Sequence, residues 1–367
     1  MQSKFKIPIY QPRLDGNEKK YVNECLDTNW ISSRGDFIQK FENAFSKYIG
    51  VNHSTAVCNG TVALHLGLVT LGIGPGDEVI VPSFTYIASV SSIIYTGAKP
   101  VFVDSLETTW QMDAKDVKRK ITEKTKAIMA VHIYGHPCEM DEIKKIAKER
   151  NLFLIEDCAE SVGAKYKGKN TGTFGDISCF SFYGNKTITT GEGGMLCTND
   201  ETLYDRAYHF KMHGLAKYRE YWHDVIGYNY RMTNICAAIG LGQLETVEKR
   251  IVEKRDIAKR YIERLKNVPV EVHKEGENVM HGYWMFSILA ENPTVREKLR
   301  YHLSNDGIET RPTFYPVHTM PMFSNKFQKL PIAEKIGWNG INLPSYPGLT
   351  DEEIEYNCNS IKEFFNI

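Results

Sequence analysis

The sequence has no long apolar run and no excess charge of either sign. No stretch approaches the roughly 20 apolar residues that a membrane-spanning helix requires, and the opening stretch, MQSKFKIPIYQPRLDG, lacks the apolar segment of a secretory signal. Lysine plus arginine equals aspartate plus glutamate, at 45 each, so the net charge favours neither a nucleic acid nor a membrane surface as partner. We therefore expect a cytoplasmic protein with no nucleic-acid or membrane partner.

Cysteine pairs at metal-binding spacing are also missing. The cysteines are scattered and form no CxxC motif, which argues against a zinc ribbon and against a disulfide framework. We expect these thiols to be reduced and mostly buried. The eight cysteines are Cys25, Cys58, Cys138, Cys158, Cys179, Cys197, Cys236 and Cys358.

What is present is an alternation of short apolar runs with segments of helical character. The apolar runs cover residues 78–83, 99–104, 126–135 and 152–161. Strands that alternate with helices predict right-handed crossovers and an α/β fold, with a mainly parallel sheet covered by helices on both faces. Ligands of such sheets bind beyond the carboxyl ends of the strands.

The pattern changes after about residue 245. A long charged helix is predicted over 244–267, followed by a strand within 281–290 and a helix over 294–306. The charges of the first helix alternate in sign, so we interpret it as a solvated connecting helix and not as a nucleic-acid surface. We expect a large α/β domain over 1–245 and a smaller C-terminal α+β domain over 246–367.

Two carboxylates stand where the strand predicted in 152–161 ends. Glu156 and Asp157 follow an apolar run, so they lie at the ligand edge of the sheet. Asp157 could cap a following helix. It could equally bond a protonated heterocyclic nitrogen, which is the partner that the ring of pyridoxal phosphate needs.

Lys186 follows the next apolar stretch and precedes a glycine-rich turn, in FSFYGNKTITTGEGG at 180–194. Most lysines are solvated, and residue type alone favours that reading. A lysine in a partly desolvated pocket, however, has a lowered pKa and can form a Schiff base with an aldehyde. The small residues of the turn would let a bulky cofactor approach the backbone.

A phosphate-binding turn and a stacking aromatic would complete such a site. Asn59, Gly60 and Thr61 precede a helical run, and free N–H groups at a helix start suit a phosphate, although an ordinary helix start has the same pattern. Tyr86 could stack on a ring or belong to the core, and Ser181 could bind phosphate or only the backbone. Their order along the chain together with Asp157 and Lys186 indicates pyridoxal phosphate.

These motifs resemble the sugar aminotransferases of the DegT/DnrJ/EryC1/StrS family. The resemblance is carried by NGT at 59–61, PSFTYIAS at 82–89, IEDCAES at 155–161, SFYGNKTITTGEGG at 181–194 and GYNYRMTNICAAIGLGQLE at 227–245. It runs nearly end to end and implies the fold type I architecture of aspartate aminotransferase. The terminal stretches are most similar to the GDP-perosamine synthases of the family, but His213 stands where these carry glutamine.

The resemblance implies a role for each matching position. Lys186 would bond the cofactor covalently, Asp157 would hold its pyridine nitrogen, Tyr86 would stack on its ring and Glu160 would lie near its 3-hydroxyl. The phosphate would be held by Gly60, Thr61 and Ser181, and by Asn229 of a neighbouring subunit, so that a homodimer shares its active sites. From the residues alone, the segment around Asn229 could equally be a hinge.

The implied reaction moves an amino group from L-glutamate to a keto sugar nucleotide, GDP-4-keto-6-deoxymannose in a perosamine synthase. One branch of the family carries histidine in place of the lysine and dehydrates sugars, so Lys186 favours aminotransfer. Another phosphorylated ketone as substrate and a catalytically silent ligand sensor stay open. Candidate substrate contacts, each of which could instead be packing or surface charge, are Trp30, Ser33, Arg34, Arg231, Tyr315 and His318.

Two other kinds of site are weakly indicated. His209 and His213 could share a helical face, but no third metal ligand is evident. GAKYKGKN at 163–170 spells GxxxxGK, but Asn170 stands where a nucleotide-binding P-loop needs serine or threonine. We expect no metal and no P-loop nucleotide site.

Overall fold

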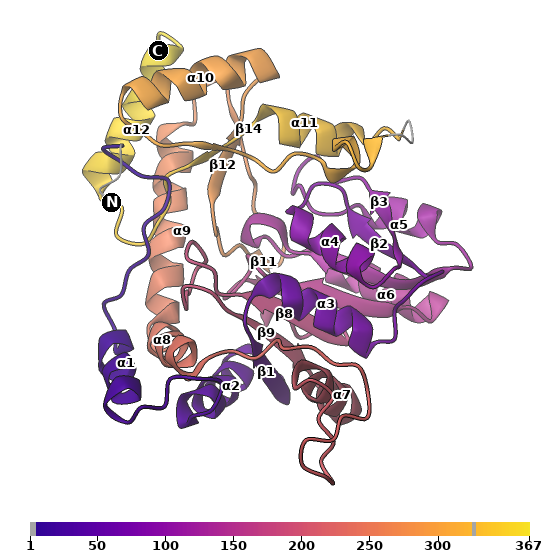
Figure 1. The fold of residues 1–367 in the computed structure, drawn as a ribbon. Coiled ribbons are helices and arrows are strands. Elements are labelled where there is room, and N and C mark those ends of the chain that lie inside the picture. Colours follow the sequence, from indigo (N-terminus) through magenta and orange to yellow (C-terminus); the bar gives the residue numbers. More distant parts are fainter. Residues whose placement is uncertain (1–4, 325–327) are drawn as a thin grey trace.

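The computed structural model describes residues 5–324 and 328–367 and has the predicted α/β fold (Figure 1). Its centre is a seven-stranded sheet in the order β1-β9-β8-β5-β4-β2-β3. The strands are β1 (His53–Val57), β2 (Glu78–Pro82), β3 (Lys99–Val103), β4 (Thr125–Val131), β5 (Phe153–Asp157), β8 (Ile177–Ser181) and β9 (Gly194–Thr198). The strands β2, β3, β4 and β5 lie within the apolar runs of the sequence or within one residue of them.

Strands β3, β2, β4, β5 and β8 are parallel neighbours, and β9 is antiparallel to both β8 and β1. The carboxyl ends of parallel strands meet at one edge of a sheet. Asp157 and Ser181 are the last residues of β5 and β8, so this topology brings them to the same edge.

The large sheet is buried on both faces. Val79 and Val81 of β2 belong to one hydrophobic cluster and Ile80 to another, and all three are fully buried. Successive side chains of a strand point to opposite faces, so burial of both faces explains the continuous apolar runs. The helices of this part are α1 (Glu18–Asp27), α2 (Asp36–Ile49), α3 (Gly60–Thr70), α4 (Ile87–Tyr95), α5 (Ala114–Lys120), α6 (Met140–Arg150), α7 (Glu201–Lys211) and α8 (Asn234–Leu244).

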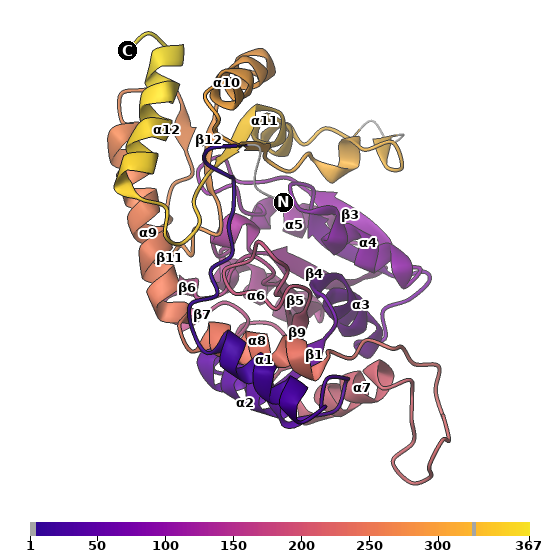
Figure 2. The same ribbon diagram turned by 60° about the vertical axis from the view of Figure 1, so that its left-hand side comes forward.

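A second, antiparallel sheet follows the long helix α9 (Val247–Arg264). Its strands are β10 (Glu271–Val272), β12 (Phe286–Leu289), β14 (Gly340–Leu343) and β13 (Arg311–Pro312), and its helices are α10 (Pro293–Asn305), α11 (Pro331–Asn339) and α12 (Asp351–Phe364). Figure 2 shows α9 and α12 side by side along one side of the molecule. The domain division at residue 245 stays a prediction; it falls between α8 and α9.

A third sheet joins the two parts of the chain. Strand β11 (Val279–Met280) pairs with β6 (Lys165–Tyr166), which forms a hairpin with β7 (Lys169–Asn170). The turn of this hairpin is made by Lys167 and Gly168, both with positive φ, a geometry typical of two-residue hairpin turns. The GxxxxGK sequence therefore lies in a β-hairpin and not between a strand and a helix.

The described helices and the cysteines agree with two of the expectations. None of the helices in the described part of the chain is long and apolar enough to cross a membrane. All eight cysteines are free of disulfide bonds, and only Cys58 and Cys236 are not fully buried.

Candidate active site

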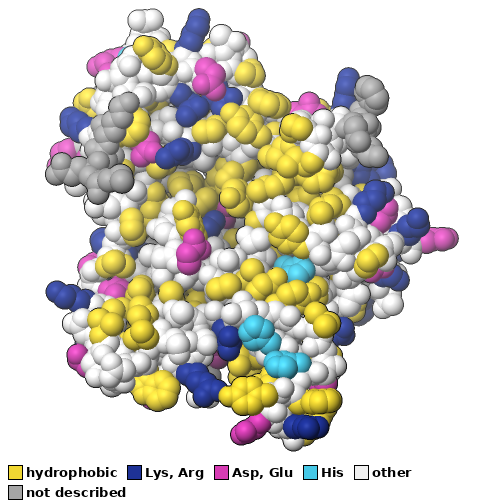
Figure 3. All heavy atoms as spheres, viewed as in Figure 1, with side chains coloured by type: hydrophobic (Ala, Val, Ile, Leu, Met, Phe, Trp, Pro, Cys, Tyr) yellow, Lys and Arg dark blue, Asp and Glu magenta, His cyan; other side chains and the backbone are white. Residues whose placement is uncertain are grey.

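A cavity of about 650 Å³ lies at the carboxyl ends of the parallel strands. It is lined from the ends of β5 and β8 and from the starts of α3 and α4, and Trp284 and Phe314 close it from the part of the chain beyond α9. Figure 3 shows hydrophobic side chains gathered across the middle of the face that Figure 1 presents.

Lys186 lies in the turn after β8, and its amine points into this cavity. Its Nζ is 3.5 Å from Glu160 Oε1 and 3.9 Å from the centroid of the Trp284 ring, and its side chain is 12% exposed. Burial lowers the pKa of Lys186, while the carboxylates of Glu160 and Asp157 act in the opposite direction. The structure therefore holds the amine in a partly desolvated pocket and not in solvent, which are the two alternatives that the sequence left open.

Asp157 ends β5 and lines the same cavity. Ser89 Oγ donates to its Oδ2 at 2.7 Å and the amide of Ala159 donates to its Oδ1 at 3.1 Å. No helix begins after Asp157, since residues 158–164 form turns, so the capping alternative is wrong. Burial raises the pKa of Asp157, and the bond from Ser89 opposes this shift. A buried carboxylate of this kind stabilises a positive charge placed beside it.

Glu160 connects Lys186 to the turn that follows β4. Its Oε2 accepts a hydrogen bond of 2.7 Å from the amide of Tyr134, and its Oε1 faces Lys186 Nζ. Burial raises the pKa of Glu160 to about 7, and Lys186 partly offsets that rise. The Glu160 carboxyl group therefore titrates near neutral pH beside the amine.

The start of α3 forms a cradle with few side-chain atoms. Asn59 caps the helix, because its Oδ1 accepts from the amide of Val62 at 3.0 Å. A Cβ added to Gly60 would lie 2.7 Å from Cβ of Ser181, so no larger residue fits there. Gly60, Thr61 and Ser181 all line the cavity, and the first amides of a helix have no partner within it. Such a cradle suits a phosphate group.

Tyr86 is not a core residue. It stands directly before α4, is 55% exposed and lines the cavity, with its ring centroid 5.4 Å from that of Phe314. An exposed aromatic ring at the mouth of a cavity can stack on a bound planar group.

These features fit pyridoxal phosphate. The cavity holds an amine for its aldehyde, a buried carboxylate for its ring nitrogen, an aromatic ring and a helix start that a side chain at Gly60 would fill. The structure thus brings together seven of the residues singled out in the sequence: Gly60, Thr61, Tyr86, Asp157, Glu160, Ser181 and Lys186.

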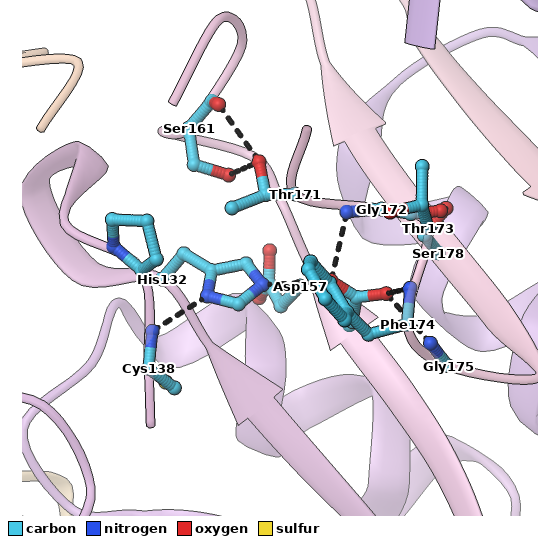
Figure 4. Close-up of polar contacts among 12 residues, drawn as sticks. His132, Cys138, Asp157, Ser161, Thr171, Gly172, Thr173, Phe174, Gly175 and Ser178 are labelled. Atoms are coloured by element: carbon cyan, nitrogen blue, oxygen red, sulfur yellow. Dashed lines mark hydrogen bonds and ion pairs between the residues drawn. The ribbon is translucent and has the colours of Figure 1, made fainter. Parts of the chain in front are cut away.

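A buried histidine beside the site was missed by the sequence reasoning. The amides of Gly172, Phe174 and Gly175 donate to the carboxylate of Glu156, each at 2.7 Å, and His132 Nε2 lies 3.0 Å from it (Figure 4). His132 Nδ1 accepts from the amide of Cys138, so Nε2 carries the proton and donates to Glu156. His132 also lines the cavity. The position of His132 just past the end of β4, at the ligand edge of the sheet, could have indicated it from the sequence.

Asn229, Arg231 and His213 lie together, but they do not line the cavity. Arg231 Nε donates to Asn229 Oδ1 at 2.9 Å, and its Nη2 lies 3.2 Å from His213 Nε2. His209, the other half of the considered metal pair, lies beside Asp224 instead, with 2.8 Å between Nε2 and Oδ1. Neither histidine belongs to a group of possible metal ligands within the described chain.

The remaining substrate candidates fall in separate places. Ser33 and Arg34 line a second hollow of about 380 Å³, to which Arg231 also contributes, whereas Trp30 is exposed. Tyr315 lines a larger hollow of about 840 Å³ that shares Tyr86 with the cavity.

His318 lines none of these hollows. It is buried, with Nδ1 bonded to Ser83 Oγ at 2.6 Å and Nε2 lying 3.2 Å from Glu334 Oε1. Its role as a substrate contact stays a prediction.

Comparison with known proteins adds to this geometry. The model of the DegT/DnrJ/EryC1/StrS aminotransferase family matches residues 12–362. GDP-perosamine synthase of Escherichia coli O157:H7 is 64% identical over 360 residues, which cover 98% of this chain and 99% of that protein. GDP-perosamine synthase of Vibrio cholerae is 50% identical over 364 residues, covering 98% and 99%.

Solved structures agree. DesV of S. venezuelae, in complex with a ketimine intermediate, superimposes with a TM-score of 0.90 at 32% identity, covering 95% of this chain and 94% of that one. Spr1654 from Streptococcus pneumoniae in its PLP form gives a TM-score of 0.93 at 29% identity, covering 98% of both chains.

Proposed function

The chain belongs to the DegT/DnrJ/EryC1/StrS aminotransferase family and is a pyridoxal phosphate-dependent aminotransferase, and we propose that it forms GDP-perosamine. The amino donor in this proposal is L-glutamate, and the acceptor is GDP-4-keto-6-deoxymannose. The 64% identity to a GDP-perosamine synthase, over nearly the full length of both chains, carries the choice of acceptor.

The residues around the cavity support a division of roles in cofactor binding. We assign the phosphate to Gly60, Thr61 and Ser181, the ring face to Tyr86 and the ring nitrogen to Asp157. We assign the cofactor's 3-hydroxyl to Glu160, and the proximity of its carboxylate to Lys186 and its hydrogen bond from the Tyr134 amide support this assignment. When bound, pyridoxal phosphate supplies an aldehyde that accepts the amino group and a ring that acts as an electron sink.

Lys186 is the chain's proton-transfer group in both halves of the reaction. Its Nζ takes the proton from Cα of glutamate in the first half, and it delivers a proton to the sugar carbon that receives nitrogen in the second. Taking a proton requires the neutral amine, which burial favours, and delivering one requires the ammonium form, which the neighbouring carboxylates favour. Trp284 and Phe314 line the cavity on the side of the antiparallel sheet β10-β12-β14-β13, and the centroid of the Trp284 ring lies 3.9 Å from the amine.

We further propose that two copies of the chain share their active sites. Asn229 and Arg231 lie outside the cavity of their own chain, so a contact with the cofactor requires a neighbouring subunit. The loop after α7, which Figure 2 shows projecting from the molecule, exposes Tyr218, Tyr221 and Ile226. Exposed apolar groups of this kind favour a protein partner, and a second copy is the simplest one.

A two-step assay tests the proposed reaction. Glutamate alone should lower the absorbance of the lysine-bound cofactor, and GDP-4-keto-6-deoxymannose added next should give GDP-perosamine, identified by its mass. Lys186→Ala cannot form the lysine-bound cofactor, so its first step is followed by the 2-oxoglutarate that glutamate releases. The rate of this release should fall by more than about 10³-fold, because the substitution removes the proton-transfer group.

Each failure of this assay has a separate meaning. An absorbance that is unchanged by glutamate would contradict glutamate as donor. Bleaching by glutamate that is followed by amination only of a different keto sugar, or of a small ketone phosphate, would overturn the acceptor and keep the aminotransferase.

A further inference from the structure

Residues 5–16, here called the N-terminal strap, run from the antiparallel sheet β10-β12-β14-β13, here called the small sheet, to α1 (Figure 2). Ile7 exchanges backbone hydrogen bonds with Gly307 and Glu309, at 3.1 and 2.9 Å. The amide of Ile9 donates to the Glu309 carboxylate at 3.1 Å, and Arg13 pairs with Glu253 of α9 at 2.8 Å. The strap is therefore tied to elements that follow the large sheet in sequence.

The strap contacts the turn that carries Lys186 through Tyr10. The hydroxyl of Tyr10 donates to the backbone carbonyl of Lys186 at 2.6 Å, across 176 positions of sequence. Burial raises the pKa of Tyr10, so the hydroxyl stays protonated and remains a donor at neutral pH. The Nζ of Lys254 lies 5.4 Å from the centroid of the Tyr10 ring.

A second side chain from outside the large sheet holds the preceding carbonyl. Trp284 Nε1 donates to the backbone oxygen of Asn185 at 2.7 Å, and the same ring faces Lys186 Nζ. Within the turn, the amide of Lys186 donates to the carbonyl of Tyr183 at 2.9 Å. A Cβ added at Gly184 would meet nothing within 4 Å, so side-chain packing does not hold the turn at that position.

We propose that Tyr10 is a positioning residue for Lys186. Its hydroxyl fixes the peptide plane that follows Lys186, and this plane sets the direction of the Cα–Cβ bond and the position of Nζ in the cavity. The inference rests on the proposed function only through the role of Lys186 in proton transfer. The hydrogen bond itself is a property of the chain without cofactor or substrate.

The strap also lines the hollow next to the lysine cavity. Ile9, Tyr10 and Pro12 form one wall of the hollow of about 840 Å³, which shares Tyr183, Asn185 and Trp284 with the lysine cavity. The same strap thus borders the hollow next to the site and bonds the carbonyl of the reactive lysine.

Tyr10→Phe, which removes only the hydroxyl, tests the proposal. Tyr261→Phe is a matched control: that buried hydroxyl also donates to a backbone carbonyl, Pro344 O at 2.9 Å, in the core of the small sheet. Amide hydrogen exchange of residues 182–193 is measured in the full chain, with and without cofactor. Steady-state kinetics are measured on the loaded enzyme with glutamate as the varied substrate and the keto sugar nucleotide in excess.

In Tyr10→Phe we expect exchange in this turn to accelerate about five-fold, in line with the loss of one hydrogen bond. The kcat should fall by a similar factor, about five-fold, because Nζ spends less time in its reactive position, while KM for glutamate changes by less than about two-fold. Tyr261→Phe should lower the melting temperature and leave both turn exchange and kcat unchanged.

Two results would overturn the proposal. One is unchanged exchange in the turn, and the other is faster exchange with an unchanged kcat, which would make the contact merely structural. Failure of the proposed function is seen separately, because an active Lys186→Ala variant would contradict the role of Lys186 whatever Tyr10→Phe does to exchange.

Discussion

Lys186 shares a buried pocket with two carboxylates, and their balance sets the fraction of its amine that is neutral. Burial disfavours the ammonium form, whereas Glu160 and Asp157 favour it. Glu160 itself titrates at a pKa of about 7 because it is buried. A rise in pH through neutrality therefore ionises Glu160 and strengthens its hold on the Lys186 proton.

Glu160→Gln should lower the pKa of Lys186, because it removes the carboxylate nearest to Nζ. In the cofactor-free protein, Lys186 forms its bond to added pyridoxal phosphate at a rate that rises with pH. We expect the midpoint of this rise to lie at a lower pH in Glu160→Gln than in the unchanged chain. This rate is measured by reducing the lysine-bound cofactor with borohydride and determining the mass of the protein by mass spectrometry. Glu192→Gln is the control, since Glu192 lines the same cavity and does not contribute to the pKa shift of Lys186. A midpoint that stays in place or rises would contradict the assignment.

Lys254 of α9 is fully buried, and its Nζ donates to the carbonyl of Ser345 at 3.0 Å. Burial lowers its pKa from 10.5 to about 7. Between these values the unfolded chain binds more protons than the folded one, so the free energy of unfolding rises with pH in this window. This contribution is complete above pH 10.5 and is lost as the pH falls through about 7.

Lys254→Met should therefore flatten the pH dependence of stability, because it removes the titrating group and keeps an unbranched chain of similar length. Urea unfolding at pH 7 and pH 9 measures the effect. The unchanged protein should gain stability between the two values, and the variant should gain less. An identical gain in both proteins would show that Lys254 is not the group responsible.

At the scale of elements, strand β5 places two neighbouring carboxylates in different environments. Successive residues of a strand point to opposite faces. Asp157 faces the cavity, whereas Glu156 is bonded by three amides, those of Gly172, Phe174 and Gly175, and by His132. The backbone of His132 also donates to the carbonyl of Asp157 at 3.1 Å. Glu156 thus ties the segment after β7 to the strand end that carries Asp157.

The start of α3 depends on the absence of a side chain at Gly60. Gly60→Ala places a methyl group 2.7 Å from Ser181 Cβ, and overpacking of this kind costs about 1–3 kcal/mol. We expect cofactor affinity to fall by about ten-fold or more, because the methyl group occupies the cradle and displaces Ser181. Gly74→Ala is the control, since its nearest neighbour would be 3.9 Å away. Equal cofactor affinity in both variants, measured by titration of absorbance, would argue against a phosphate site at α3.

At the scale of the whole molecule, Asn229 of each subunit in the proposed dimer contacts the cofactor bound in the cavity of the other subunit. Lys186→Ala and Asn229→Ala should each be strongly impaired when alone. When equal amounts of the two variants are dissociated together and reassembled, half of the dimers contain one subunit of each. Each of these dimers has one intact site of two, so about a quarter of the wild-type activity should return. No recovery, although mass analysis shows mixed dimers, would contradict shared sites.

Much of the cavity could be predicted because its residues lie at strand ends and helix starts that the apolar pattern marks. Asp157, Ser181 and Gly60 are examples, and the family resemblance added the role of Glu160 and favoured stacking for Tyr86. Tyr10 and Trp284 carry no comparable signal. They reach the Lys186 turn from 176 and 99 positions away, and no local pattern specifies contacts of that separation.

The sequence by itself determined the alternation of strands and helices in the parallel sheet, the strand end that carries Asp157 and the family, because these depend on local periodicity and on motifs read in order. Only the tertiary structure decided how dry the Lys186 pocket is, why Glu160 titrates near neutral pH and which side chains hold the lysine turn. These properties arise from desolvation and from hydrogen bonds between distant segments. Both are set by packing in three dimensions, and both change the protonation of groups whose identity the sequence already contains.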